Sequence, residues 1–298
     1  GVTGGEVDTV MAVLTFFLLY FLFASTSRDE HDVRRAVIVM AVSAAIVFVV
    51  SVLQMFGAWI FPWDFAQNSA FNPVGTTNAL GLYFGLLFII LCAAAYYGEW
   101  SKRTRIGLAV VAGLLFVGCV FIGYWPVFVG LIAAMILCVV ADLRAHGASA
   151  SRRILLPLAV VVFSLFILSI AAGALTFKLP RLEAPAEITP SISASWGIAK
   201  GTVMDGVSNF LFGSGPGTYQ YQYAHFRDAA LNQSLFWNIR FAQGFNAIMS
   251  HLVTVGVGGT LLFLLLLVVA AGEALRVIIG SRVYTPLIRG VAAGVVYC

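Results

Sequence analysis

The chain has 298 residues, of which 61% are hydrophobic and only 10% are charged, with a formal net charge of +4. Soluble domains carry roughly a quarter charged residues, so this composition excludes a soluble globular protein and indicates a polytopic helical membrane protein. The apolar runs have helix length and lack the alternation of a β-barrel. The small positive excess indicates no nucleic-acid partner.

Seven apolar runs are long enough to cross a bilayer. In chain order they are Val7–Ala24, Ala36–Phe56, Ala79–Tyr97, Ile106–Tyr124, Pro126–Ala141, Ile154–Phe177 and Ala247–Ala271. An incomplete eighth run begins near Gly290. Because the chain starts without methionine and stops inside this run, we expect it to be the middle of a longer protein. The predicted fold is an all-α bundle with six spans over residues 1–177, a long partly helical loop domain over 178–245, and a seventh and truncated eighth span over 246–298.

Arginine and lysine alternate from loop to loop and predict the orientation. They follow the odd-numbered spans, at Arg28, Arg34, Arg35, Lys102, Arg103, Arg105, Arg144, Arg152, Arg153, Arg276, Arg282 and Arg289. The short loops on the other side, residues 57–78 and 123–125, contain neither residue. By the positive-inside rule the basic loops are cytoplasmic, so the long loop is expected to face outward from the cytoplasmic membrane.

The long loop from Lys178 to Phe245 is where we expect any chemistry. Connections without structure of their own rarely exceed about 15 residues, so an insert of this length usually carries function or folds. It holds ionisable side chains, whereas the spans carry almost none. These are Lys178, Arg181, Lys200, Arg227, Arg240, Glu183, Glu187, Asp205, Asp228 and His225.

The first part of this loop predicts an extended segment followed by a helix. Three prolines make Leu179–Pro190 extended or turn-like. Ser191 or Ser193 can then cap a helix that runs to about Phe212. Its apolar positions recur at helical spacing, and we expect them to be buried in the protein rather than to lie on the membrane surface. They are Trp196, Ala199, Val203, Val207 and Phe210.

A glycine-rich turn and two aromatic–polar groups follow the helix. Gly213 is a natural helix stop, and Gly215, Pro216 and Gly217 continue a turn whose amides can approach an anion, although most such turns are only turns. The two groups are Tyr219-Gln-Tyr-Gln-Tyr223 with His225, Phe226, Arg227 and Asp228, and Trp237, Asn238, Arg240, Phe241 and Gln243. Rings with interleaved amides and arginines suit sugar or phosphate binding, and they also suit packing at a membrane interface.

Three segments resemble the O-antigen ligase and O-antigen polymerase superfamily of GT-C membrane glycosyltransferases. Asn72-Pro-Val-Gly75-Thr-Thr-Asn78-Ala-Leu-Gly81 is similar to the family's glycine–asparagine segment before a span. Leu211-Phe-Gly213-Ser-Gly215-Pro-Gly217-Thr-Tyr219 is similar to its G-x-G-P-G-T-F/Y turn. Asn246, Gly256, Gly259 and Phe263 have the spacing of its segment that enters the next span. The resemblance covers roughly Phe71 to Leu265.

The resemblance implies an enzyme of cell-envelope and lipopolysaccharide biogenesis. Family members move a glycan from a polyprenyl-pyrophosphate carrier to a glycan or lipid acceptor outside the cytoplasmic membrane, without a nucleotide, a metal or another cofactor. In the ligases, arginines bind the pyrophosphate and a histidine is the proposed base. We therefore predict Arg240 as the main catalytic cation, with Arg181 and Arg227 as weaker ones. The predicted substrate-binding residues are Gly213, Gly215, Gly217, Tyr219, Trp237, Asn238 and Asn246.

The chain departs from the ligase pattern at the base. Phe245 occupies the ligase histidine position, and Thr254 stands where the family often has glutamate. The remaining candidates for a general base, in order of preference, are His225, Glu183, Glu187 and Asp205. His251 lies within a predicted span and is expected to be a hydrogen-bonded core histidine. The alternative function is transport or flipping of a lipid-linked or small solute, against which the lack of ionisable residues within the spans counts. The choice between ligase and polymerase stays open.

Overall fold

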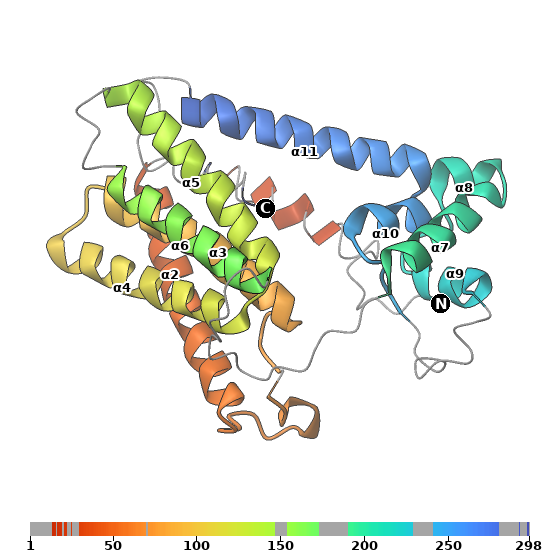
Figure 1. Ribbon diagram of the computed structural model, residues 1–298, viewed down its shortest axis with the longest axis horizontal. Helices are drawn as coiled ribbons and strands as arrows, with labels where there is room; N and C mark the ends of the chain where they lie inside the picture. Colours follow the sequence, from red (N-terminus) through yellow and green to blue (C-terminus); the bar gives the residue numbers. More distant parts are fainter. Residues whose placement is uncertain are drawn as a thin grey trace. The chain divides into compact units, whose positions relative to one another are not determined.

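The regular structure is helical throughout the described part of the chain. The computed structural model describes residues 30–69, 71–146, 154–172, 190–228 and 241–279, with isolated residues before 30 and after 279. All its regular elements are helices (Figure 1). Five of them are long and apolar enough to cross a membrane. The predicted all-α class is confirmed for these residues, and the five apolar helices are compatible with a multi-pass membrane protein.

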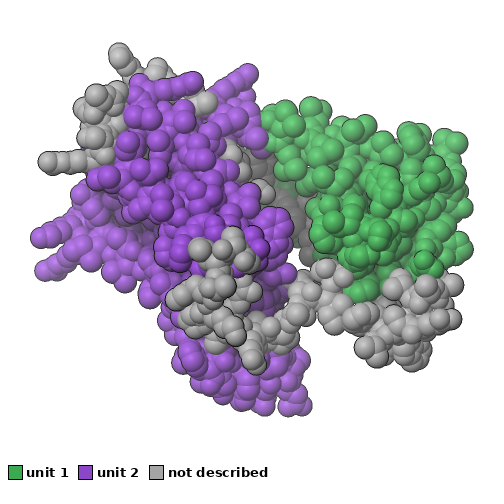
Figure 2. Space-filling view, in the orientation of Figure 1, with its two compact units in different colours: residues 1–28, 188–269 green, residues 29–187, 270–298 purple. Residues whose placement is uncertain are grey.

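The chain divides into two compact units (Figure 2). Unit 1 comprises residues 1–28 and 188–269, and unit 2 comprises residues 29–187 and 270–298. The described part of the expected loop domain belongs to unit 1. That unit continues beyond Phe245, where we placed the end of the loop, as far as Val269.

Unit 2 contains six of the described elements. They are α2 (Glu30–Met55), the 3-10 helix η1 (Asp64–Ala66), α3 (Thr77–Tyr97), α4 (Lys102–Ile122), α5 (Trp125–His146) and α6 (Leu155–Ala171). The four long helices match the second to fifth predicted spans. The predicted span Ile154–Phe177 is described as far as residue 172, and this part forms α6. Most of the predicted span Val7–Ala24 lies outside the described residues.

Local sequence signals set where these helices begin and end. The Thr76 hydroxyl accepts a hydrogen bond from the amide of Ala79 at the start of α3, and Ser101 accepts one from Thr104 at the start of α4. Such caps satisfy amides that have no partner within the helix. Gly123, with φ of +65°, ends α4 in the left-handed conformation that glycine adopts without strain.

Side-chain packing holds unit 2 together, with α3 at its centre. Leu80 and Phe84 of α3 are fully buried with Leu115 of α4 and with Phe128 and Leu131 of α5. Cys119 is also buried, forms no disulfide and packs as a small hydrophobe. The core therefore consists of interlocking apolar side chains.

Two of the basic loops meet at one end of unit 2. The Arg34 guanidinium donates a hydrogen bond of 2.7 Å to the Glu99 carbonyl oxygen, lies 3.7 Å from the Glu99 carboxylate and lies over the Trp100 ring. At the opposite helix ends, the Gln54 amide donates to the carbonyl of Ala66 in the loop that lacks arginine and lysine. Loops that the charge pattern assigns to one side thus share one end of the unit. The side of the membrane that each end faces stays a prediction.

Unit 1 is built from shorter helices. They are α7 (Ile192–Met204), α8 (Val207–Phe212), α9 (Tyr219–Phe226), α10 (Ala247–Thr254) and the first part of α11 (Gly256–Ile279). The Ser191 cap is confirmed, because its hydroxyl accepts from the amide of Ala194. The predicted continuous helix to Phe212 is wrong. Gly206, with φ of +139°, breaks it between α7 and α8 in a conformation that favours glycine.

The expected buried face of this helix is also wrong at most of its positions, although Ala199 is buried as predicted. Trp196, Val207 and Phe210 are exposed, whereas the buried positions of α7 are Ser195, Ile198, Ala199 and Thr202. The small side chains of the buried face let α7 approach α9 and α10 closely, and Thr202 satisfies its own hydroxyl by donating to the Ile198 carbonyl. Close approach, rather than apolar character, selects the buried face here.

The predicted seventh span is not one helix. It is broken at Val255, so that the short α10 precedes α11, and α11 continues to Ile279 rather than to Ala271. Gly256 has φ of +68° at the break. Hydropathy cannot detect this break because the residues on both sides are apolar. The expected core histidine, His251, is half-buried in α10 with its ring against Phe263.

Candidate functional site

The glycine-rich turn after α8 fits against the break between α10 and α11. A Cβ on Gly213 would lie 2.5 Å from the amide nitrogen of Gly256, and a Cβ on Gly256 would lie 2.5 Å from the amide nitrogen of Gly213. A Cβ on Gly258 would lie 2.8 Å from the carbonyl oxygen of Leu211. These approaches are too close for any side chain, so the two backbones meet only because these positions are glycine.

Hydrogen bonds tie the turn to the end of α10. The amides of Ser214 and Gly215 donate to the carbonyl oxygens of Val253 and Thr254, both at 2.9 Å, and the Ser214 hydroxyl also donates to Val253. These carbonyls have lost their helical partners at the break, and the turn satisfies them. The amides of Gly213, Ser214 and Gly215 are thus occupied and are not free to bind phosphate. Gly217, with φ of +71°, shapes the turn just before α9.

Two tyrosines of α9 lie in the core of unit 1. Tyr219 and Tyr223 are each 1% exposed and pack with Ile198, Ala199 and Val253. The Tyr219 hydroxyl is buried and has no hydrogen-bond partner among the described residues. An unpaired buried hydroxyl is unfavourable, which makes this predicted substrate-binding residue notable.

Burial raises the pKa of the Tyr219 phenol above its ordinary value of 10.0. The neighbouring Ser195 hydroxyl opposes part of this shift, and the neighbouring Tyr223 adds to it. The two hydroxyl groups are close enough for Ser195 to affect the phenol, but they do not meet the geometry of a hydrogen bond. The phenol is therefore neutral at physiological pH and keeps one proton that it can donate.

Two serines position the segment that precedes α10. The Ser195 hydroxyl accepts a hydrogen bond of 2.9 Å from the amide of Phe245, and the Ser250 hydroxyl accepts one of 2.9 Å from the amide of Gly244. Gly244 lies beside the Tyr219 hydroxyl, because a Cβ there would be 3.1 Å from it. Neither serine was predicted from the sequence, because a single serine on α7 or on α10 carries no pattern of its own.

The remaining described candidates lie at the edges of the helices. Asn246 caps α10, because its side chain accepts from the amide of Met249 at 2.9 Å. His225 is exposed in the last turn of α9, with its ring edge against Phe226. Arg227 is the next residue beyond α9 and is half-buried. Asp205 ends α7 and is exposed. The structure therefore groups Gly213, Gly215, Tyr219 and Asn246 around α10.

Several predicted site residues lie outside the described residues. They are Arg240, Arg181, Trp237 and Asn238, together with the alternative bases Glu183 and Glu187. Their assignments stay predictions from the sequence. Within the described ranges no three histidine, cysteine or acidic side chains gather as metal ligands do.

The first of the three resembling segments lies in unit 2. Asn72 shapes the turn before α3, since its side-chain oxygen accepts from the amides of Val74 and Gly75 and its amide donates to the Gly75 carbonyl. Asn72 is thereby occupied with its own turn.

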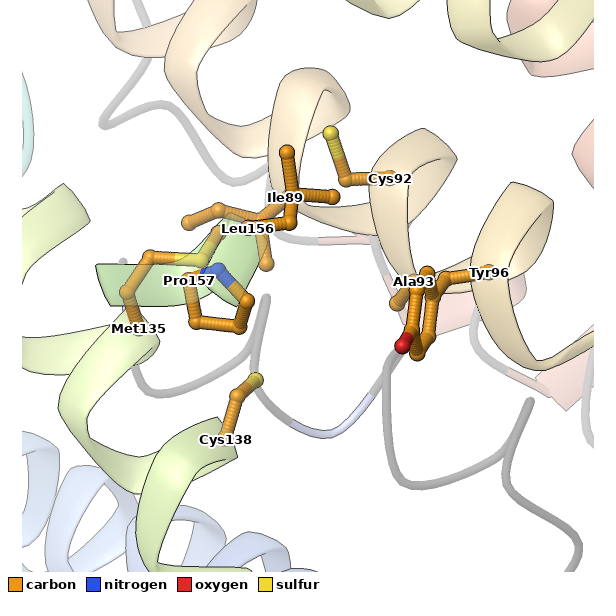
Figure 3. Close-up of a pocket in the computed structure, with 8 residues that line it drawn as sticks. All are labelled: Ile89, Cys92, Ala93, Tyr96, Met135, Cys138, Leu156 and Pro157. Atoms are coloured by element: carbon orange, nitrogen blue, oxygen red, sulfur yellow. The ribbon is translucent and has the colours of Figure 1, made fainter. Parts of the chain in front are cut away.

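Unit 2 contains an apolar cavity that is too small for a sugar or an isoprenoid chain. Side chains from α3, α5 and α6 line it (Figure 3). They are Ile89, Cys92, Ala93, Tyr96, Met135, Cys138, Leu156 and Pro157. The space open to the centre of a water-sized sphere is about 20 Å³, which accommodates about one water molecule. The cavity therefore holds neither a sugar nor an isoprenoid chain.

Comparison of the chain with protein-family models, curated proteins and solved structures finds no match.

Proposed function

We propose that the protein is a glycosyltransferase that transfers or polymerises a glycan from a polyprenyl-pyrophosphate carrier at the outer face of the cytoplasmic membrane. One observation carries the proposal. Two of the three segments that resemble the O-antigen ligase and polymerase superfamily, residues 211–219 and 246–263, meet backbone to backbone at Gly213 and Gly256. The contact explains why both positions are glycine. A resemblance that arose by chance would not bring the two segments together in the structure.

The reaction needs a charge partner for the leaving group. The acceptor hydroxyl oxygen forms a bond to the anomeric carbon, the bond from that carbon to the pyrophosphate breaks, and the carrier leaves as an anion. A guanidinium pairs bidentately with phosphate oxygens and stabilises this developing charge. Arg240 is the proposed main cation because it precedes the return of the chain into the apolar segment at Ala247, and Arg181 and Arg227 are secondary.

The Tyr219 hydroxyl is the proposed hydrogen-bond donor or acceptor for the glycan. It is buried, neutral and unpartnered among the described residues, and it lies beside Gly244 just before α10. The base that takes the acceptor proton is proposed to be His225, with Glu183, Glu187 and Asp205 as alternatives. Stabilisation of the leaving group supplies most of the rate if the proton leaves late.

Transport is the second candidate, because transporters use interrupted helices. The break at Val255 is the observation that favours it. In transporters the freed carbonyls at such a break coordinate an ion, whereas the carbonyls of Val253 and Thr254 here accept hydrogen bonds from Ser214 and Gly215. The glycine turn thus fills the break, and transferase is the better-supported proposal.

The test is transfer in proteoliposomes that contain a polyprenyl-pyrophosphate-linked glycan and a candidate acceptor. Release of the carrier pyrophosphate and growth of the acceptor are measured together. We expect Arg240→Lys to impair transfer nearly as much as Arg240→Ala, because lysine keeps the charge but loses the fork. Arg276→Lys is the matched control, since Arg276 forms an exposed ion pair with Glu273 on α11.

Two outcomes would overturn this function. Activity that excess EDTA abolishes and magnesium or manganese restores would contradict the metal-free mechanism. Glycan or solute that crosses the vesicle membrane without release of the carrier pyrophosphate would identify a transporter.

A further inference from the structure

Helix α8 exposes almost all of its apolar surface. None of its six residues is buried. Val207 is 78% exposed and Phe212 is 72% exposed, and Phe210 and Leu211 are exposed as well. A short helix that is apolar and uncovered on this scale is unfavourable in water and marks an interaction surface.

The position of α8 beside α11 indicates that lipid covers its apolar surface. Its last residues, Leu211 and Phe212, contact the backbone of Gly256 and Gly258 in the first turn of α11. The exposed apolar surface of α11 begins at Leu261, five residues after Gly256. At 1.5 Å per residue, α8 therefore lies within about 8 Å of the level at which α11 presents apolar side chains outward. That distance is about the thickness of one headgroup layer.

The outer stripe of α7 has the composition of an interfacial surface. Trp196, Lys200 and Met204 recur every four residues on the face opposite the buried Ser195 and Thr202, and all three are exposed. Tryptophan favours the headgroup level, and a lysine there can extend its ammonium group to lipid phosphates while its methylenes lie in the apolar layer.

We infer that α8 and this stripe of α7 form a lipid-binding surface that lies in the headgroup layer of the bilayer that α11 enters. The surface, called here the interfacial patch, consists of Trp196, Lys200, Met204, Val207, Phe210, Leu211 and Phe212. Met204, Val207 and Phe212 insert below the headgroups, and Lys200 contacts the phosphates. The patch holds the glycine turn and Tyr219 at the depth of the membrane surface.

Two features of the chain favour lipid over a second copy as the occupant. The end of α8 contacts the first turn of α11, a helix that can itself cross a membrane. Lys200 complements the phosphate groups of lipids, and Asp205 lies in the connection between the two helices rather than within the stripe. A second copy would place two Lys200 ammonium groups near each other if the same surface bound itself.

The test places a photoreactive p-benzoylphenylalanine at Phe212, at Val207 or at Tyr221 in the full chain. Tyr221 is the matched control, because it is an exposed aromatic residue of unit 1 outside the patch. Each variant is illuminated in vesicles of phosphatidylethanolamine and phosphatidylglycerol, and phospholipid adducts are measured by intact-protein mass spectrometry. We expect several-fold more adduct at positions 212 and 207 than at position 221.

A second measurement needs no photoreactive residue. The difference in fluorescence between the wild-type chain and Trp196→Phe isolates Trp196, and lipids brominated near the headgroup should quench it more than lipids brominated at the chain ends. Equal adduct yields at the three positions, a covalent dimer as the main product at position 212, or no quenching of Trp196 would each overturn the proposal.

Discussion

Units 1 and 2 hold their helices together in different ways. In unit 2, side chains interlock. The Phe84 ring lies over Gly118, and its centroid is 5.9 Å from the centroid of the Phe48 ring. In unit 1, backbones touch directly, because Gly213 and Gly256 leave no room for a side chain between them. Side chains can adjust to a change in a neighbour, whereas a backbone that carries hydrogen bonds cannot. The contact between Gly213 and Gly256 should therefore be far less tolerant of substitution than the side-chain contacts of unit 2.

The largest effect is expected for Gly213→Ala. Its Cβ would lie 2.5 Å from the amide nitrogen of Gly256 and 2.6 Å from the carbonyl oxygen of Thr254, at a residue whose φ is +71°. Overpacking and left-handed strain together should destabilise the protein by about 3–5 kcal/mol. Thermal unfolding of the purified protein in detergent measures this loss.

Gly197→Ala is the matched control in the same unit. Gly197 lies inside α7, and a Cβ there would meet nothing within 4 Å. Alanine should stabilise the helix by about 0.5–1 kcal/mol. If Gly213→Ala were as harmless as Gly197→Ala, the contact between backbones would not hold unit 1 together.

The second prediction concerns Gly118→Ala in unit 2. Its Cβ would lie 2.7 Å from the Phe84 ring, which is nearly as close as the contacts of Gly213, but the neighbour is a side chain. The cost should be about 1–2 kcal/mol. Phe84→Leu in the same chain should recover part of it, because the smaller side chain makes room for the methyl group.

A double-mutant cycle measures this recovery. Simple additivity of Gly118→Ala and Phe84→Leu would contradict the idea that side-chain adjustment absorbs the change. No comparable rescue exists for Gly213→Ala, since its neighbours are backbone atoms.

The third prediction is a smaller loss for Ser195→Ala. The variant removes the hydroxyl that accepts from the amide of Phe245, and it leaves that part-buried amide unsatisfied. The expected loss is about 1 kcal/mol in the free energy of unfolding. Ser193→Ala is the control, because Ser193 is exposed and should change stability by less than about 0.5 kcal/mol. Equal effects of the two variants would show that the Ser195 bond does not position Phe245.

The two units also differ in how far the sequence predicts them. In unit 2, apolar runs alone were sufficient to predict four helices, because side-chain hydropathy is what packs them; the caps at Thr76 and Ser101 were not predicted. In unit 1, the cap at Ser191 and the stop at Gly213 were predicted correctly. The break at Val255 was not predicted, because hydropathy does not depend on whether two distant glycines contact each other through their backbones.

The candidate site shows the same limit. The glycine turn and Tyr219 were identified from their pattern and resemblance, but their contacts were not. The turn donates hydrogen bonds to the carbonyls of Val253 and Thr254, which follow the turn by almost forty residues in the sequence. Ser195 and Ser250 were missed because single serines carry no pattern until the fold brings them to Gly244 and Phe245.

The last prediction has the smallest effect on stability and the opposite sign. Tyr219→Phe removes a buried hydroxyl that has no partner among the described residues, so the protein should become about 1 kcal/mol more stable. Burial holds the pKa of this phenol above 10.0, so the folded state keeps a proton that the unfolded state loses as the pH rises above that value. The stability that the neutral phenol provides is complete below about pH 10 and is lost as the pH rises toward the folded-state pKa.

The advantage of Tyr219→Phe over the wild-type protein should therefore grow above about pH 10, and denaturation at about pH 8 and pH 11 measures it. Transfer should respond in the opposite direction. A site that hydrogen-bonds a sugar through this hydroxyl loses binding when the hydroxyl is removed, so KM should rise by about tenfold while the fold becomes more stable. A more stable variant with unchanged KM would assign Tyr219 to packing alone. A less stable variant would mean that the hydroxyl has a partner in the folded protein and is not reserved for substrate.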